Sequence, residues 1–281
     1  MSPSSLTETS IGPPAGSSAY YALQRCPRGS LQALRLLLDV HVQVRSVVTK
    51  VSDAAVAQAK LAWWQAQIEA LDQGRPADHP SLRALAPHLQ TQGLQPGALL
   101  GVTESVAIDL RQNRWMDRAA LLHYCRVSSG QTLRNTAALL GLTSPAALDA
   151  AEELGCGLRL TSIIRHLGRD VAEGRVYLPL DVLQEHGVTA AQLQQRALTP
   201  PIRALLESET RRAQAALRAA RQGLAPYPIA QTAPLIAIAA QYATLLREIE
   251  RADYAVLHQR ISLTPLRKLW ISRSCTWRRG G

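Results

Sequence analysis

The chain alternates long amphipathic stretches with short polar breaks rich in Gly, Pro and Ser. Within the long stretches, apolar residues recur every three or four positions, which places them on one face of a helix. This spacing predicts helices over residues 31–51, 54–71, 81–90, 98–111, 117–140, 146–171, 190–196, 201–223 and 233–260. Ser52 and Asp53 are expected to cap the second of these helices, and residues 175–179 to form an irregular connector.

The composition agrees with an all-α fold. The 281 residues are 47% hydrophobic and 19% charged, contain no Phe, and draw most of their apolar mass from Leu and Ala, which favour helices. This apolar, weakly charged composition is not that of a disordered chain. Because no run of about 18 apolar residues occurs, a membrane-spanning chain is not expected either. We expect one helical domain over residues 17–270, a disordered N-terminal arm over 1–16 and a basic tail over 271–281.

The charge is strongly positive. Lys and Arg total 31 against 21 Asp and Glu, a formal net charge of +10, and only Lys50, Lys60 and Lys268 are lysines. Such an excess either reflects a GC-rich genome or favours anionic partners such as nucleic acid, an acidic membrane surface or a phosphorylated ligand. Because no nucleic-acid recognition motif and no long basic stripe occur, a nucleic-acid partner is not expected.

Common catalytic and metal-binding motifs are missing. No phosphate-binding loop, dinucleotide fingerprint, zinc-protease motif or nucleophile elbow occurs. The four cysteines are widely spaced, which argues against structural zinc and gives no support for disulfides. The first 18 residues carry neither the basic nor the apolar region of a signal peptide, so we expect a cytoplasmic protein.

Several tracts resemble the squalene/phytoene synthase family, the all-α head-to-head prenyltransferases. The tracts in which the resemblance lies are Ser18-Ala19-Tyr20-Tyr21 with Pro27, Val51-Ser52-Asp53 with Lys60-Leu61-Ala62-Trp63-Trp64, His79-Pro80 with Ala84-Leu85, Asp109-Leu110 with Arg114-Trp115, Tyr124-Cys125 with Gly130, Leu160-Thr161, and Gly174-Arg175-Val176-Tyr177-Leu178-Pro179. The tracts at 60–64 and 174–179 are the most specific, and together the tracts cover nearly the whole chain.

The resemblance implies an isoprenoid-synthase-like helical bundle around a central cavity. Members of that family condense two farnesyl or geranylgeranyl diphosphates there. Two aspartate-rich motifs, D-D-x-x-D and D-x-x-E-D, hold magnesium ions that neutralise the leaving diphosphate, a task suited to carboxylates on successive helical turns.

This chain departs from both motifs. Counting back from the Lys60 tract, the first motif falls on residues 45–49, where Arg45, Ser46 and Thr49 replace its three aspartates. The family's preceding Cys-Arg pair, which includes a diphosphate-binding arginine, falls on residues 41 and 42.

The second motif, counted back from Arg175, falls on residues 166–170, and only Asp170 is kept. The family's Asn and Gln, one and two turns earlier, fall on Ser162 and Arg159, whereas the arginine just before the motif is kept as Arg165. One carboxylate among guanidinium groups cannot supply the several oxygen ligands of Mg²⁺. We therefore predict no cofactor, and magnesium only if the chain is an active prenyltransferase.

Two interpretations of the altered positions stay open. In the first, the arginines form a metal-free anion site, since one guanidinium group binds two phosphate oxygens. In the second, the site has drifted, and its arginines point outward or pair with Asp170 and Asp53. The candidate ligand-binding residues are Arg45, Ser46, Thr49, Arg159, Ser162, Arg165, His166, Arg169, Asp170, Arg175, Tyr177 and Tyr242; no catalytic or metal-binding residue is proposed.

Three further features have both a functional and a structural interpretation. His166 lies four residues before Asp170, a spacing at which a carboxylate raises a histidine pKa, although a solvated or structural histidine fits as well. Trp63 and Trp64 are adjacent and point apart, which predicts one in the core and one toward a groove. Four tyrosines either line a prenyl cavity or simply pack: Tyr20, Tyr21, Tyr177 and Tyr242.

The last segment, residues 266–279, interleaves basic residues with two tryptophans. Such a segment suits an anionic bilayer surface, and an ordinary solvated tail is the alternative. If this segment binds a membrane, we expect the cytoplasmic protein to lie at the surface of the inner membrane.

Three hypotheses about function follow. In the first, the chain is a catalytically degenerate family member that binds an isoprenoid diphosphate or an apolar lipid and serves, with a protein partner, as an assembly or accessory factor. In the second, it is an active prenyltransferase in which Arg45, Arg159 and Arg169 neutralise the diphosphate. In the third, it is a helical scaffold without a cavity.

Overall fold

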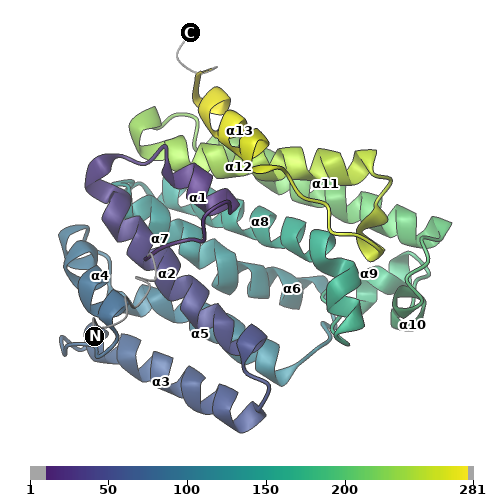
Figure 1. Ribbon diagram of the computed structural model, residues 1–281, viewed down its shortest axis with the longest axis horizontal. Helices are drawn as coiled ribbons and strands as arrows, with labels where there is room; N and C mark the ends of the chain where they lie inside the picture. The colour runs from purple at the N-terminus through teal and green to yellow at the C-terminus, as the bar shows by residue number, and fades with distance from the viewer. Residues whose placement is uncertain (1–10, 278–281) are drawn as a thin grey trace, which may run out of the picture.

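The computed structural model describes residues 11–277, which fold into a bundle of α-helices (Figure 1). The helices are α1 (Ser18–Leu23), α2 (Arg28–Lys50), α3 (Ala54–Asp72), α4 (Pro80–Thr91), α5 (Leu100–Arg111), α6 (Arg118–Cys125), α7 (Gln131–Leu139), α8 (Pro145–Ala172), α9 (Leu180–Glu185), α10 (Ala190–Gln194), α11 (Pro200–Gly223), α12 (Ile229–Arg251) and α13 (Pro265–Trp277). Two 3₁₀ segments, η1 (Pro96–Leu99) and η3 (Ala255–Leu257), and a π-helical segment, η2 (Arg126–Gly130), join them. The all-α prediction is confirmed.

Helix α8 is the longest and crosses the middle of the molecule (Figure 1). It packs against α7, α11, α12 and η2. Glycines allow two of its closest contacts, because a Cβ at Gly155 would lie 2.2 Å from the Ser129 carbonyl oxygen and one at Gly168 would lie 2.4 Å from that of Leu257. The neighbouring backbones therefore touch α8 directly.

Helix α2 packs against α3, α4, α5 and α7. Its buried face carries Leu34, Leu37, Val44 and Val47, in the spacing of an amphipathic helix. At the turn into α3, the Asp53 side chain accepts a hydrogen bond from the Val56 amide at 2.8 Å, so the predicted cap is confirmed.

Two connectors lie side by side and bring distant parts of the chain together. The Val176 amide donates to the Asn113 carbonyl at 3.0 Å, the Leu180 amide donates to the Trp115 carbonyl at 3.0 Å, and Arg114 and Val176 form an isolated parallel bridge. This pairing places the connector after α8 against the end of α5.

Two predicted helices differ from the observed ones. The helix expected over 117–140 is interrupted by η2, since five residues in the middle adopt π-helical geometry. The helix expected over 233–260 spans Ile229–Arg251 instead, because Asp253 and Tyr254 adopt left-handed φ angles of 52° and 54° that end it.

Three short or terminal helices, α1, α9 and α13, were not expected from the pattern. The domain boundary expected after residue 270 falls inside α13, where Ile271 is buried. Most of the N-terminal arm, residues 1–10, lies outside the described residues, as do residues 278–281 of the tail. Residues 11–16 form bends and a turn, and Lys268 donates to the Gly16 carbonyl oxygen at 2.8 Å.

Within the described residues, α12 alone is long and apolar enough to cross a membrane by length and composition. Of its most apolar 18-residue stretch, 61% is buried inside the protein. It packs against α1, α8, α11 and α13, as a core helix of a helical bundle does.

Candidate functional site

A buried carboxylate, Asp109 on α5, lies where α2, α5, α6 and the connector after α8 meet. Its Oδ2 accepts hydrogen bonds from Tyr124 at 2.8 Å and from Arg45 Nη1 at 2.6 Å. Its Oδ1 accepts one from Tyr177 at 2.8 Å. The Asp109 side chain is fully buried, so both oxygens are satisfied by protein groups.

Two more guanidinium groups close this cluster. Arg159 packs over the rings of Tyr124 and Tyr177, with its central carbon 4.8 and 5.3 Å from their centroids, and donates to the Tyr124 hydroxyl. Arg175 donates to the backbone oxygen of Asp109 at 2.7 Å and lies 3.6 Å from Oδ1 of the same residue. Three cations therefore surround one carboxylate.

Aromatic stacking holds the two hydroxyl donors in place. Trp115 stacks on Tyr177 with centroids 4.3 Å apart, and Tyr124 lies 5.5 Å from Tyr177. Trp115 and Tyr177 lie on the two paired connectors, so the pairing places the Tyr177 hydroxyl beside Asp109.

The charges in the cluster stabilise one another. Burial disfavours the Asp109 carboxylate, yet Arg45 and Arg159 hold its pKa below the usual value. Burial opposes the charge on Arg159 as well, but the Tyr124 and Tyr177 oxygens and Asp109 raise its pKa overall. Asp109 is thus ionised and Arg159 charged at neutral pH.

The residues at the first motif take three different directions. Arg45 enters the Asp109 cluster and donates also to Ser105 Oγ at 3.3 Å. Ser46 donates to the carbonyl of Gln43 at 2.6 Å within its own helix, and Thr49 is exposed. These positions are therefore not assembled into one ligand set.

On α8, Arg165, His166 and Arg169 follow Arg159 at helical spacing. The Arg165 Nε is buried without a hydrogen-bond partner, and the partly exposed Arg169 pairs with Asp170 at 2.6 Å. Ser162 donates to the Leu158 carbonyl at 2.9 Å. Arg169 therefore fits the interpretation in which the arginines pair with carboxylates. Arg165 is left available to bind an anion.

Two cations outside α8, Arg260 and Lys268, act electrostatically together with Arg165. Burial and then Arg260 lower the pKa of Arg165, while Tyr242 opposes this shift. Burial, Arg165 and Arg260 lower the pKa of Lys268. We call Arg165, Arg169, Arg260 and Lys268 the α8 basic cluster.

Of the two interpretations of His166, the one in which Asp170 raises its pKa is wrong, and a structural histidine fits. Burial, followed by Arg169 and Arg165, lowers the pKa of His166 to about 3, so its imidazole is neutral at physiological pH. The Asp170 carboxylate is occupied by Arg169, and burial raises the pKa of Asp170.

The residues at the two motif positions do not fit magnesium. The first motif supplies a guanidinium group bound to Asp109, and the second supplies one carboxylate already paired with Arg169. Over residues 11–277, no group of three or more His, Cys, Asp or Glu side chains is arranged to hold a metal ion. A hard cation such as Mg²⁺ requires several oxygen ligands.

Sequence reasoning named Arg45, Arg159, Arg175 and Tyr177 but not the carboxylate that gathers them. Asp109 and Tyr124 stood only within the tracts of resemblance. Arg260 was not named, and Lys268 stood only in the basic segment 266–279, because their relation to Arg165 depends on how the chain returns after α12.

A family comparison decides the assignment, since the model for "Squalene/phytoene synthase" matches residues 13–267. The chain belongs to the squalene/phytoene synthase family. Of the residues in the two clusters, Arg45 falls within the first motif and Arg169 within the second when the motifs are counted from the tracts of resemblance.

Curated relatives agree with this assignment. The chain is 34% identical over 207 residues to a phytoene synthase of Thermus thermophilus, covering 73% of this chain and 70% of that protein. It is 27% identical to the chloroplastic phytoene synthase 1 of Arabidopsis thaliana over 212 residues, covering 73% of this chain. It spans about half the length of the chloroplastic phytoene synthases of the Oncidium hybrid cultivar and Arabidopsis thaliana.

Solved structures share the fold. A dehydrosqualene synthase superposes with a TM-score of 0.81 at 21% identity, covering 93% of this chain and 91% of that one. A squalene synthase from Alicyclobacillus acidocaldarius gives a TM-score of 0.77 at 22% identity, covering 83% and 88%.

Proposed function

We propose that this squalene/phytoene synthase-like protein is catalytically degenerate, binds an isoprenoid diphosphate or another lipid without magnesium, and acts as an assembly or accessory factor. The observation that carries the proposal is the ion pair between Arg45 and Asp109. At that motif position, the side chain is a cation engaged with the protein's own carboxylate and is not a metal ligand.

The α8 basic cluster supports the anion-binding part. Arg165 has an unpartnered buried Nε, and the cations nearest to it repel its charge. A diphosphate would relieve this repulsion by accepting hydrogen bonds from Arg165, Arg260 and Lys268, the groups best suited to phosphate oxygens. We expect the protein in the cytoplasm, peripheral at the inner membrane surface, where an isoprenoid and a protein partner are both accessible.

The test is a paired binding and turnover experiment. Farnesyl diphosphate is titrated into the protein in EDTA by calorimetry. In parallel, radiolabelled farnesyl and geranylgeranyl diphosphates are incubated with the protein, with and without Mg²⁺, and hydrocarbon products are extracted. We expect saturable binding and no product, while the phytoene synthase of Thermus thermophilus forms product in the same assay.

Arg165→Gln should weaken binding about tenfold, because one charge-assisted contact is lost. Arg218→Gln on the exposed face of α11 removes the same charge and should leave binding unchanged. Extracted hydrocarbon would overturn the degenerate assignment and restore the active prenyltransferase. Absence of binding would overturn the isoprenoid ligand.

A further inference from the structure

We propose that a groove between α2 and α3 binds a small anionic amphiphile, a phosphate or carboxylate attached to an apolar group. This site is separate from the Asp109 cluster and the α8 basic cluster. The groove has a volume of about 370 Å³ and is lined by Gln43, Ser46, Val47, Lys50, Val51, Lys60, Trp63, Trp64 and His79. Small-molecule pockets typically measure about 300–1,000 Å³.

Aromatic side chains form the apolar part of the groove. Trp64 is buried, whereas Trp63 keeps 43% of its surface exposed, and their rings meet edge to face with centroids 5.3 Å apart. The prediction that one tryptophan is core and the other faces a groove is confirmed. An exposed indole beside buried Val47 offers an apolar wall that a ligand can cover.

The charged part consists of two ammonium groups. Lys50 and Lys60 are two of the three lysines in a chain whose other basic residues are arginines, and both line this groove. No carboxylate belongs to the lining. Three carboxylates lie just outside the lining, those of Asp39, Asp53 and Asp78, and each accepts a hydrogen bond from another group of the protein. The lining itself is therefore cationic and attracts an anion.

A closed ring of hydrogen bonds fixes the polar wall. Gln43 donates to Asp39 Oδ2 at 2.5 Å, and Ser81 Oγ donates to the same oxygen at 2.6 Å. His79 Nδ1 accepts from the Ser81 amide at 3.2 Å, so its Nε2 carries the proton and donates to Gln43 Oε1 at 2.9 Å.

This ring has two consequences for binding. His79 is held rigidly against Trp64, with ring centroids 4.5 Å apart, so the wall is preorganised. Because Gln43 and His79 satisfy each other, the groups left to bind an anion are the two ammoniums. A ligand recognised here needs a negative head for the lysines and an apolar body for the indoles.

Decyl phosphate, used below its micelle concentration, is the probe. Calorimetry should show saturable binding of decyl phosphate, with much weaker binding of inorganic phosphate and of decanol, which each carry half of the recognised chemistry. The double variant Lys50→Gln, Lys60→Gln should lose at least tenfold in affinity. Trp63→Ala should weaken decyl phosphate binding and leave the weak phosphate binding unchanged.

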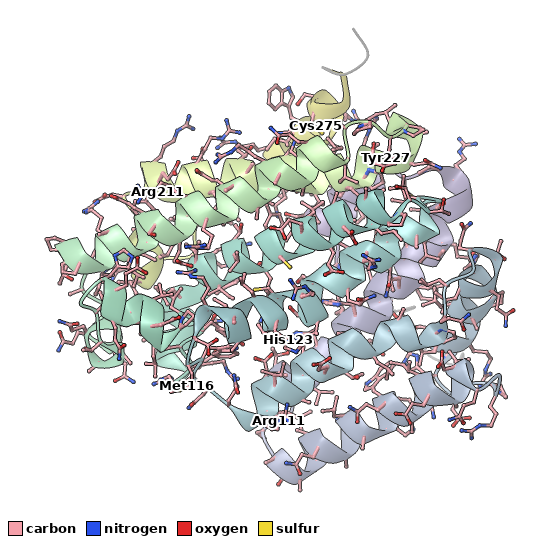
Figure 2. The ribbon with its side chains drawn as sticks, turned by 180° about the vertical axis from the view of Figure 1, so that it is seen from behind. Arg111, Met116, His123, Arg211, Tyr227 and Cys275 are labelled. Atoms are coloured by element: carbon pink, nitrogen blue, oxygen red, sulfur yellow. The ribbon has the colours of Figure 1, made fainter. Side chains whose placement is uncertain are left out.

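The charge-matched control is Arg211→Gln with Arg218→Gln on the exposed face of α11. Arg211 lies at the upper edge of the molecule, and α3 lies at the lower edge (Figures 1 and 2). Equal losses of decyl phosphate affinity in both double variants would mean that the lysines act only through the net charge of the protein. That result would overturn the site. The site is also overturned if decanol binds as tightly as decyl phosphate, or if decyl phosphate does not bind saturably.

A third variant separates this site from the proposed function. Arg165→Gln lies in the α8 basic cluster and should leave unchanged the part of the decyl phosphate binding that the lysine double variant removes. If Arg165→Gln abolishes binding and the lysine variant does not, the amphiphile occupies the α8 basic cluster and the groove is not its site.

Discussion

The carboxylate of Asp109 is buried among guanidinium groups, and its loss would leave Arg45 and Arg159 in the interior without a counter-charge. Removing one partner of a buried ion pair costs about 3–5 kcal/mol, because the other charge stays desolvated. We therefore expect Asp109→Asn to lower the free energy of unfolding by about that amount in urea titrations followed by circular dichroism.

Asp149→Asn is the matched control, since its carboxylate pairs with Arg134 at 2.6 Å but is 70% exposed. Exposed pairs contribute less than about 1 kcal/mol. A loss at Asp109 no larger than the loss at Asp149 would mean that the buried cluster is not held by its charges.

The pH dependence gives a second readout of the same variant. Because the folded-state pKa of Asp109 is lowered, its contribution is present above the unfolded value of about 3.9 and is lost as pH falls through the folded pKa. The difference in stability between the wild type and Asp109→Asn should therefore narrow below about pH 4.

At this scale, the sequence identified the arginines but not their arrangement. Arg45 and Asp109 are 64 positions apart, and no periodicity links them. Their meeting depends on how α2 packs on α5. The interpretation that Asp170 raises the His166 pKa fails for a similar reason, because this neighbour in sequence is already bound to Arg169.

At the scale of elements, α8 and the π-helical segment η2 pack through their backbones. A Cβ at Gly155 would lie 2.2 Å from the Ser129 carbonyl oxygen, and both partners are fixed in helical structure. We expect Gly155→Ala to cost about 3 kcal/mol or more, because the two helical segments must separate. Urea unfolding monitored by circular dichroism measures the loss.

Gly29→Ala in α2 is the corresponding control, since an added Cβ there meets no atom within 4 Å. It should stabilise the protein by about 0.5–1 kcal/mol, the gain from replacing Gly in an exposed helix. If the two alanine variants unfold alike, the close approach at η2 is not essential to the fold.

The long helices could be predicted because a stripe of apolar residues extends over several turns. Helices α1 and α9 have six residues each, too few for a period to emerge, and their positions depend on tertiary packing. The π-helical segment was also beyond prediction, since no local pattern marks it and its close approach to Gly155 joins it to another helix.

At the scale of the whole molecule, the net charge of +10 is unevenly distributed. Part of it is buried around Asp109 and part faces α8, whereas α13 carries basic residues and no acidic residue. On its outer side, Leu266 is 79% exposed and Trp270, one turn later, is 66% exposed. The fold thus turns part of the segment expected to be a tail into a helix with exposed apolar residues, in which Arg273 is exposed and the half-buried Arg267 pairs with Glu248 at 2.6 Å.

We expect this surface to bind anionic bilayers, because indole rings partition to the headgroup level and basic residues attract acidic lipids. In sedimentation with vesicles, the fraction bound should be higher with phosphatidylglycerol than with phosphatidylcholine alone and should fall with salt. Leu266→Ala combined with Trp270→Ala should release most of the bound protein.

Met116→Ala serves as the control for lost exposed apolar surface, since Met116 is 67% exposed and lies at the opposite edge of the molecule from Cys275 of α13 (Figure 2). Its binding should equal that of the wild type. If the α13 double variant sediments with anionic vesicles as fully as the wild type does, α13 is an ordinary solvated helix. The positive charge would then act only within the protein and at its ligand sites.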